Sequence, residues 1–188
     1  MLNLQVFIAS TRDNRLGPLV GDWFFEYAQK HGKFNVELVD LRAVNLPLFN
    51  EPRHPRLRQY EYEHTKAWSA VVQRADAFVF VTPEYDHSSP PALLNALCYL
   101  VHEWAYKPVG FVSYGGVSAG TRSVQMTKLT VVALKMMPMF EAVNIPFFNQ
   151  YVDSDTGTFK PPDIQNQAAG VMLDELLKWT EALKPLRS

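Results

Sequence analysis

The chain has 188 residues, of which 47% are hydrophobic and 20% charged, with a formal net charge of −1. This length and balance are typical of a globular protein with a sizeable core, and we expect a single domain over residues 1–188. The near-neutral charge gives no basis for binding nucleic acid, and the single cysteine excludes an internal disulfide. The absence of a signal sequence or a membrane-length apolar run predicts a cytoplasmic protein.

The first part of the chain alternates strand and helix patterns. Residues 4–9 form an apolar run, as in a parallel strand buried on both faces. Apolar residues then recur at helical spacing from Leu16 to Ala28, and Gly32 is a plausible end for that helix. The next segments are predicted as a half-exposed strand at 34–41, a long loop at 42–60 and a charged helix at 61–74.

The alternation continues to the C-terminus. The expected elements are a strand at 77–81, a polar loop at 82–91, a helix from Pro91, a strand at 107–113, a helix to about Met136, a strand within 140–147 with Pro138 and Pro146 as punctuation, and a last helix with Met172, Leu176, Trp179 and Leu183 on one face. Five strands in this rhythm predict an α/β fold. We expect a flavodoxin-like three-layer sandwich whose parallel sheet has the strand order 2-1-3-4-5.

The loop after the first strand has the composition of a phosphate site. It offers the hydroxyls of Ser10 and Thr11, the guanidinium groups of Arg12 and Arg15, and the N-terminus of the following helix. These donors and charges suit a phosphate dianion, and the lack of a dinucleotide or P-loop glycine pattern favours a mononucleotide. The alternative is an ordinary helix cap with two solvated arginines.

Two further loops follow the third and fourth strands. The first, from Thr82 to Pro91, is crowded with polar residues, and parallel strands direct such loops toward a ligand. The second contains Gly115 and Gly116 after Tyr114, and glycines allow close approach of the backbone to a ligand. Each loop alone is equally compatible with a plain connection. No second cluster completes a ligand set around the loop's histidine, so we expect no metal site.

The segment from Gly116 to Gly120 matches the G-x-S-x-G pattern of serine hydrolases, with Ser118 as the nucleophile. A serine hydrolase that uses this pattern has its histidine after the serine in the chain, whereas all five histidines of this chain precede Ser118. A serine hydrolase is therefore only a remote alternative. Cys98 lies among apolar residues and is expected to be a buried, inert thiol.

Three motifs together resemble the NADPH-dependent FMN reductases, a family that includes quinone and azo-dye reductases. They are Ser10-Thr11-Arg12 with Arg15 and Gly17, then Thr82-Pro83-Glu84-Tyr85-x-His87-Ser88, then Ser113-Tyr114-Gly115-Gly116-Val117-Ser118. The resemblance spans about residues 4–147 and implies a flavodoxin-like fold with FMN at these loops. It implies that the first loop holds the FMN phosphate, the second lines the isoalloxazine, and the third follows its other edge. The implied cofactor-binding residues are Ser10, Thr11, Arg12, Arg15, Leu16, Gly17, Pro83, Glu84, Tyr85, Asp86, His87, Ser113, Tyr114, Gly115 and Gly116.

Four positions depart from the family pattern: Ala9 and Ala119 replace glycines, Leu94 a frequent lysine and Asp86 the usual asparagine. The resemblance implies an oxidoreductase that takes a hydride from NAD(P)H and passes electrons to a small acceptor by a ping-pong mechanism. Acceptors of this kind are quinones, azo compounds, free flavins and metal oxyanions. No side chain is required as an acid or base, so no catalytic residue is assigned. The alternative function is that of an FMN-binding electron carrier or redox sensor without turnover.

The helix from Pro91 to about Ala105 is apolar around most of its circumference, including Leu94 and Trp104. A helix that flanks a sheet needs only one apolar face for the core. We therefore expect a second subunit to cover the other face, giving a homodimer or a dimer of dimers with Trp104 as an interface anchor. The alternative cover is the helix at 121–136 or the long loop at 42–60.

Overall fold

The structure is a computed structural model, and it describes residues 1–187. The strands are β1 (Leu2–Ile8), β2 (Phe34–Asp40), β3 (Ala77–Thr82), β4 (Pro108–Tyr114) and β5 (Met137–Ile145). All four strand pairs are parallel, and the order across the sheet is β2-β1-β3-β4-β5. The predicted fold class is confirmed.

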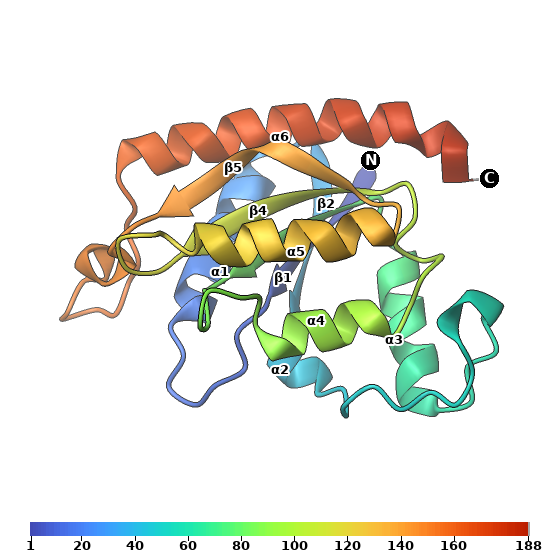
Figure 1. Cartoon of the computed structure of the whole chain (residues 1–188). Helices are drawn as coiled ribbons and strands as arrows, with labels where there is room; N and C mark the ends of the chain where they lie inside the picture. Colours follow the sequence, from blue (N-terminus) through green and yellow to red (C-terminus); the bar gives the residue numbers. More distant parts are fainter. Residues whose placement is uncertain (188) are drawn as a thin grey trace.

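Helices cover both faces of the sheet (Figure 1). They are α1 (Gly17–His31), α2 (Leu41–Val44), α3 (Glu63–Gln73), α4 (Pro91–Cys98), α5 (Thr121–Ala133) and α6 (Asp163–Leu183), with 3-10 segments at Pro55–Leu57, Phe148–Tyr151 and Lys184–Arg187. The helices α1 and α6 pack on one face, while α3, α4 and α5 pack on the other. Within residues 1–187, none of the helices has the length and apolar character that crossing a bilayer requires.

Successive residues of a strand face opposite sides of the sheet and so pack into two different cores. Val6 faces α1 and α6, whereas its neighbour Phe7 faces the other side. There Phe7 packs against Trp68 and Trp104, with ring centroids 5.5 and 6.2 Å away. Gln5 is also buried, and its amide donates to Glu37 and to the Val71 carbonyl at 2.8 Å each. Each face of the sheet thus has its own core beneath the helices, as strands buried on both faces require.

The helix after Pro91 is shorter than expected and corrects two predictions. It ends at Cys98, and the chain then turns so that Trp104 is 0% exposed in the core. Trp104 is therefore wrong as an interface anchor. Cys98 is exposed rather than buried, because it lies on the outer side of α4.

The long segment 42–60 carries more structure than the predicted loop. The Asp40 carboxylate accepts a hydrogen bond from the Arg42 N–H at 2.9 Å, which caps the short α2. Farther along, the Asn95 side chain bonds the backbone of both Pro47 and Phe49. The segment thus covers one flank of α4, which is the alternative cover expected from the sequence.

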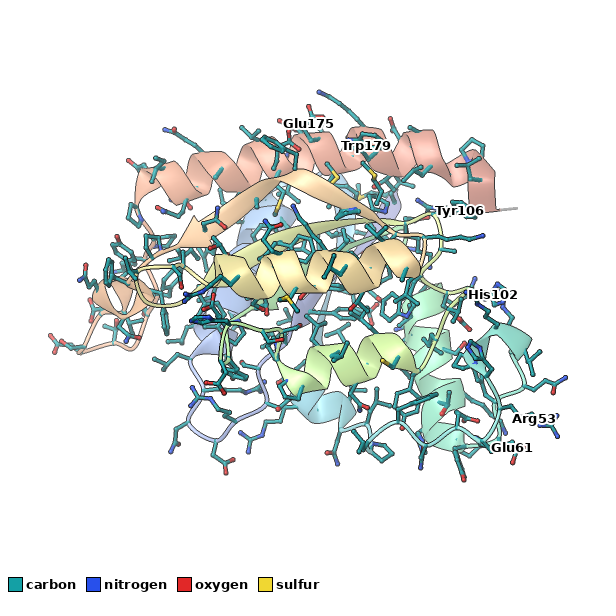
Figure 2. The ribbon with its side chains drawn as sticks, viewed as in Figure 1. Arg53, Glu61, His102, Tyr106, Glu175 and Trp179 are labelled. Carbon is teal, nitrogen blue, oxygen red and sulfur yellow. The ribbon has the colours of Figure 1, made fainter. Side chains whose placement is uncertain are left out.

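The last strand and the two helices around it differ from the sequence-based prediction. Pro138 lies inside β5, where an edge strand tolerates a missing N–H, and the chain bulges so that Phe140 is 90% exposed. The helix α5 ends earlier than Met136 because Lys135 adopts a left-handed conformation. In α6, Trp179 is 38% exposed rather than part of the core face; Figure 2 shows it on the same helix as Glu175.

Candidate functional site

A cavity of about 750 Å³ opens at the carboxyl ends of the strands. It lies beside β1, where the strand order reverses and where open α/β sheets bind their ligands. The three loops that form it lie on the left of the view in Figure 1, away from both termini. The lining residues are Ser10, Arg12, Asn14, Arg15, Leu16, Pro83, Glu84, Tyr85, Asp86, Pro91, Tyr114, Gly115, Phe148 and Asn149.

The floor of the cavity is made by the start of α1. A Cβ atom added to Gly17 would lie 2.2 Å from the Ser10 hydroxyl oxygen and 2.6 Å from the Tyr114 phenol oxygen, so only glycine fits here. The Ser10 hydroxyl is buried and has no partner at hydrogen-bonding geometry within residues 1–187. No side chain caps the first turn of α1. The loop thus offers a hydroxyl and helix N–H groups to an anion.

Arg15, which the sequence resemblance implies at the phosphate, has a partner within the protein. Its guanidinium forms a bidentate pair with the Asp40 carboxylate at the end of β2 and also donates to the Ser10 carbonyl. Burial would raise the pKa of Asp40, but the hydrogen bonds from Arg15 and the Arg42 N–H outweigh it and hold the pKa below its usual value. Arg15 therefore fastens the phosphate-type loop to β2.

Arg12 is the cation that remains available at this loop. Within residues 1–187 it forms no ion pair, and its Nε donates to the Tyr85 hydroxyl at 3.2 Å. Its guanidinium carbon also lies 5.3 Å from the centre of the Tyr85 ring. This contact joins the first loop to the second over the mouth of the cavity.

The second loop closes as a tight hairpin. Tyr85 and Ser88 exchange backbone hydrogen bonds of 3.1 and 2.8 Å, and the two residues between them, Asp86 and His87, have φ values of 48° and 64°. Two positive φ values identify a type I′ turn, for which aspartate is well suited. The turn keeps Asp86 at the cavity and directs His87 to a separate hollow beside α5.

Glu84 anchors this hairpin to α5. Its carboxylate accepts from the Arg122 Nε at 2.6 Å and from the Arg122 backbone N–H at 3.2 Å. Burial would raise the pKa of Glu84, but Arg122 outweighs it and keeps the pKa below its usual value, so the group is a carboxylate. Ser118 belongs to this network, since its hydroxyl accepts from Arg122 at 2.9 Å.

The Ser118 hydroxyl has no histidine beside it in the described residues. Its hydrogen-bond partners there are Arg122 and Glu84. A nucleophilic serine needs an adjacent general base to take its proton, and the Glu84 carboxylate, 3.5 Å away, is a weak one because its pairing with Arg122 holds its pKa below the usual value. The geometry of the G-x-S-x-G segment thus gives no support to a hydrolase.

The third wall combines β4 with a segment the sequence did not single out. The Tyr114 ring packs against Phe148 at 4.9 Å, and the Phe148 N–H bonds the Gly115 carbonyl at 3.3 Å. Burial raises the pKa of Tyr114 to about 12, so its phenol is a neutral donor at physiological pH. Asn149 follows Phe148 along the rim.

Ten of the residues predicted for the site line the cavity and five do not. Gly17 lies beneath it, and Ser113 is buried with its hydroxyl on the Asn144 side chain at 2.9 Å. Thr11 faces a different hollow, between α2 and α4. His87 lines the hollow beside α5 instead, and Gly116 is not among the residues that line the cavity. The residues missed are Asn14, Pro91, Phe148 and Asn149; the position of the last two just after β5, at the same sheet edge, was the available signal.

Comparisons with known proteins agree with this geometry. Residues 2–150 match the family model described as NADPH-dependent FMN reductase. The chain is similar to the NAD(P)H-dependent FMN reductase C4B3.06c of Schizosaccharomyces pombe, with 38% identity over 146 residues, 76% of this chain and 73% of that protein. It is also similar to an NADPH:quinone oxidoreductase of Arabidopsis thaliana, with 30% identity over 116 residues, 60% of this chain and 54% of that protein.

A solved structure extends the likeness in fold. FerB, a flavoenzyme NAD(P)H:(acceptor) oxidoreductase from Paracoccus denitrificans, superposes with a TM-score of 0.72 at 20% identity. The match covers 97% of this chain and 98% of that one. At this identity the similarity concerns the fold.

Proposed function

Because the chain belongs to the NADPH-dependent FMN reductase family, we propose that it is an FMN-dependent oxidoreductase that uses NAD(P)H to reduce a small acceptor. The observation that carries the proposal is the cavity at the point where the strand order reverses, with an unpartnered buried hydroxyl and an uncapped helix start at its floor. The likeness to quinone and FMN reductases supports the same reading.

The residues present fit FMN. A cavity of about 750 Å³ lies within the roughly 300–1,000 Å³ of small-ligand sites. The phosphate would be held by the Ser10 hydroxyl, the N–H groups at the start of α1 and the Arg12 guanidinium, whereas Arg15 orients the loop through Asp40. The ring system would lie between the hairpin of Tyr85 and the wall formed by Tyr114 and Phe148.

When bound, FMN would supply the redox chemistry, which is the transfer of a hydride from NAD(P)H and of two electrons to the acceptor in a ping-pong cycle. The chain supplies position and electrostatics. The ion pair of Glu84 with Arg122 holds the hairpin that forms one wall, and Pro83 and Pro91 limit the motion of its two ends. No side chain is assigned as an acid or base.

The acceptor is expected to be a small planar or oxidising molecule. The open cavity has both aromatic and charged walls, so a quinone can approach the same place that the nicotinamide leaves. Azo compounds, free flavins and metal oxyanions are further acceptors with the same requirement.

Steady-state kinetics test this proposal. NADPH oxidation by the FMN-loaded protein with a quinone should give parallel double-reciprocal lines, and Ser118→Ala should retain this activity. A protein that holds FMN but shows no turnover with any of these acceptors would be an electron carrier or sensor instead. Ester cleavage by the wild type that is lost in Ser118→Ala would instead support the serine hydrolase.

We further propose a homodimer, or a dimer of dimers, that uses the outer faces of α4 and α5. These neighbouring helices expose an apolar surface composed of Leu94, Cys98, Met126, Leu129 and Val132. Exposed apolar side chains on two neighbouring helices are typical of an interface between subunits. It replaces Trp104, which is in the core, as the basis for association.

Sedimentation of the flavin-loaded protein tests the dimer. Leu129 is 70% exposed, so Leu129→Glu places a charge on this surface without disturbing the core. We expect wild type to sediment as a dimer or larger and the variant to dissociate. A monomeric wild type at micromolar concentration would contradict the proposal, and Leu186→Glu, at an exposed leucine outside these helices, is the control.

A further inference from the structure

A second cavity, of about 650 Å³, lies at the opposite end of the sheet from the proposed flavin site. It is bordered by the residues that precede β3 and β4 and by the C-terminal 3-10 segment. An adjoining hollow of about 410 Å³ shares His102, Ala105 and Tyr106 with it, so the two form one cleft. Figure 2 shows His102 and Tyr106 at the end of the molecule that carries the C-terminus.

The cleft is strongly cationic in a chain whose net charge is −1. Among the residues that the structure describes, its lining includes six lysine or arginine side chains and a single carboxylate, that of Asp76. The basic residues are Arg56, Arg58, Lys107, Lys135, Lys184 and Arg187. Like charges gathered around one hollow repel one another, and a bound anion relieves that repulsion.

The one carboxylate is already engaged. Asp76 accepts from the Arg187 Nη1 at 3.0 Å and from the Asn3 backbone N–H at 2.8 Å. Arg187 is held further by the Tyr106 carbonyl at 3.0 Å. Asp76 therefore neutralises Arg187, and among residues 1–187 the other basic side chains of the cleft form no ion pair.

Lys107 is built into the wall of the cleft. It is 5% exposed, and its ammonium donates to the Val72 and Gln73 carbonyls at 3.0 and 3.3 Å, with the Phe78 ring 5.6 Å away. Within residues 1–187 no carboxylate forms an ion pair with it. The ammonium uses two of its three donors on these carbonyls and has one left.

Arg58 and Lys184 form the accessible part of the site. Both are exposed, both line the cavity, and in the described part of the chain neither is in an ion pair. Arg58 follows the 3-10 segment Pro55–Leu57 in a left-handed conformation, with its backbone N–H bonded to Pro55, which fixes the base of its side chain. His102 is oriented by a 2.9 Å contact with the Arg56 carbonyl.

We propose that this cleft binds a small oligophosphate anion, independently of the flavin site. The cations are distributed along two joined hollows, so a chain of two or three phosphates meets more of them than a single monovalent ion does. Arginine and lysine side chains are suited to phosphate, and the volume suits a small molecule. The phosphates could belong to a free oligophosphate or to a nucleotide.

Calorimetry with inorganic tripolyphosphate on the FMN-saturated chain tests the proposal at low ionic strength. We expect one site, and we expect Arg58→Gln with Lys184→Gln to raise the Kd at least tenfold. The matched control is Lys30→Gln with Lys160→Gln, which removes the same charge from two exposed lysines outside the cleft and should leave the Kd unchanged. Adenosine triphosphate in place of tripolyphosphate separates the sources: equal affinity indicates recognition of the phosphates alone, and tighter binding a nucleotide site.

Three results would overturn the site. They are no binding to the wild type, an equal loss in the control variant, and binding that disappears when FMN saturates the protein. Because Arg58 and Lys184 are exposed, both variants should keep the wild-type Tm. Amide chemical shifts at Tyr106 and Lys107 on titration give a second readout, and their absence in the wild type would also contradict the cleft assignment.

Discussion

Replacing the two arginines of the first loop should change different properties: FMN affinity for Arg12 and the free energy of unfolding for Arg15. Arg12 is exposed and free of ion pairs in the described chain, whereas Arg15 is engaged with the half-buried Asp40. Arg12→Ala should raise the Kd for FMN by about ten- to a hundredfold, the equivalent of one charge-assisted phosphate contact, and leave the free energy of unfolding unchanged.

Arg15→Ala should instead destabilise the apo protein. It leaves the Asp40 carboxylate without its bidentate partner, and we expect a loss of about 2 kcal/mol in the free energy of unfolding. The value lies below that of a fully buried pair because the Asp40 side chain is 28% exposed and keeps the Arg42 N–H. Asp40→Asn in the same chain should recover most of the loss, since it removes the unpaired charge.

Urea unfolding of the apo proteins and fluorescence titration with FMN measure the two quantities. The reasoning is refuted if Arg15→Ala lowers FMN affinity more than Arg12→Ala while its stability stays at the wild-type value. That pattern would mean that Arg15 leaves Asp40 to contact the phosphate directly.

Three further changes probe the hairpin, the end of α5 and the buried lysine. Asp86→Asn keeps a residue suited to the type I′ turn and removes a negative charge at the cavity, so the two-electron potential of bound FMN should rise by about 30 mV. A potential that stays the same or falls would mean that the carboxylate points away from the flavin or is protonated. Lys135→Gly relieves a φ of 59° and should raise the free energy of unfolding by about 1 kcal/mol in urea; no gain would contradict the strain. Burial lowers the pKa of Lys107 from 10.5 to about 8, so between these pH values the unfolded chain binds more protons than the folded one. The free energy of unfolding should therefore rise by about 3 kcal/mol from pH 8 to pH 10.5. Lys107→Met should lack this rise.

The sheet was predictable because strands buried on both faces have a simple sequence signature. The apolar runs predicted at 4–9 and 77–81 coincide, within two residues at each end, with β1 and β3, and the rhythm of strands and helices predicts their order. Helix ends were less predictable where tertiary contacts decide them. The helix after Pro91 stops at Cys98 because Trp104 must enter the core, and α5 stops because Lys135 takes a conformation usual for glycine.

The site was predictable as three loops but not as a set of contacts. Parallel strands bring Ser10, Tyr85 and Tyr114 to one edge, because Ser10 and Tyr85 follow recognisable strands and Tyr114 ends one. The pairing of Arg15 with Asp40 joins residues 25 positions apart in sequence, and nothing local in the sequence shows that one arginine would be occupied and the other free. The contribution of Phe148 depends on the path of the chain after β5. Pro138 and Pro146 make that path hard to predict from the sequence.

The most direct test of the account is anaerobic mixing of the FMN-loaded protein with NADPH. We predict that the visible flavin absorbance is lost and then returns when a quinone is added, with two electrons transferred per bound flavin. Flavin that stays oxidised in excess NADPH and NADH, in a protein that binds FMN at one site per chain, would contradict the central claim.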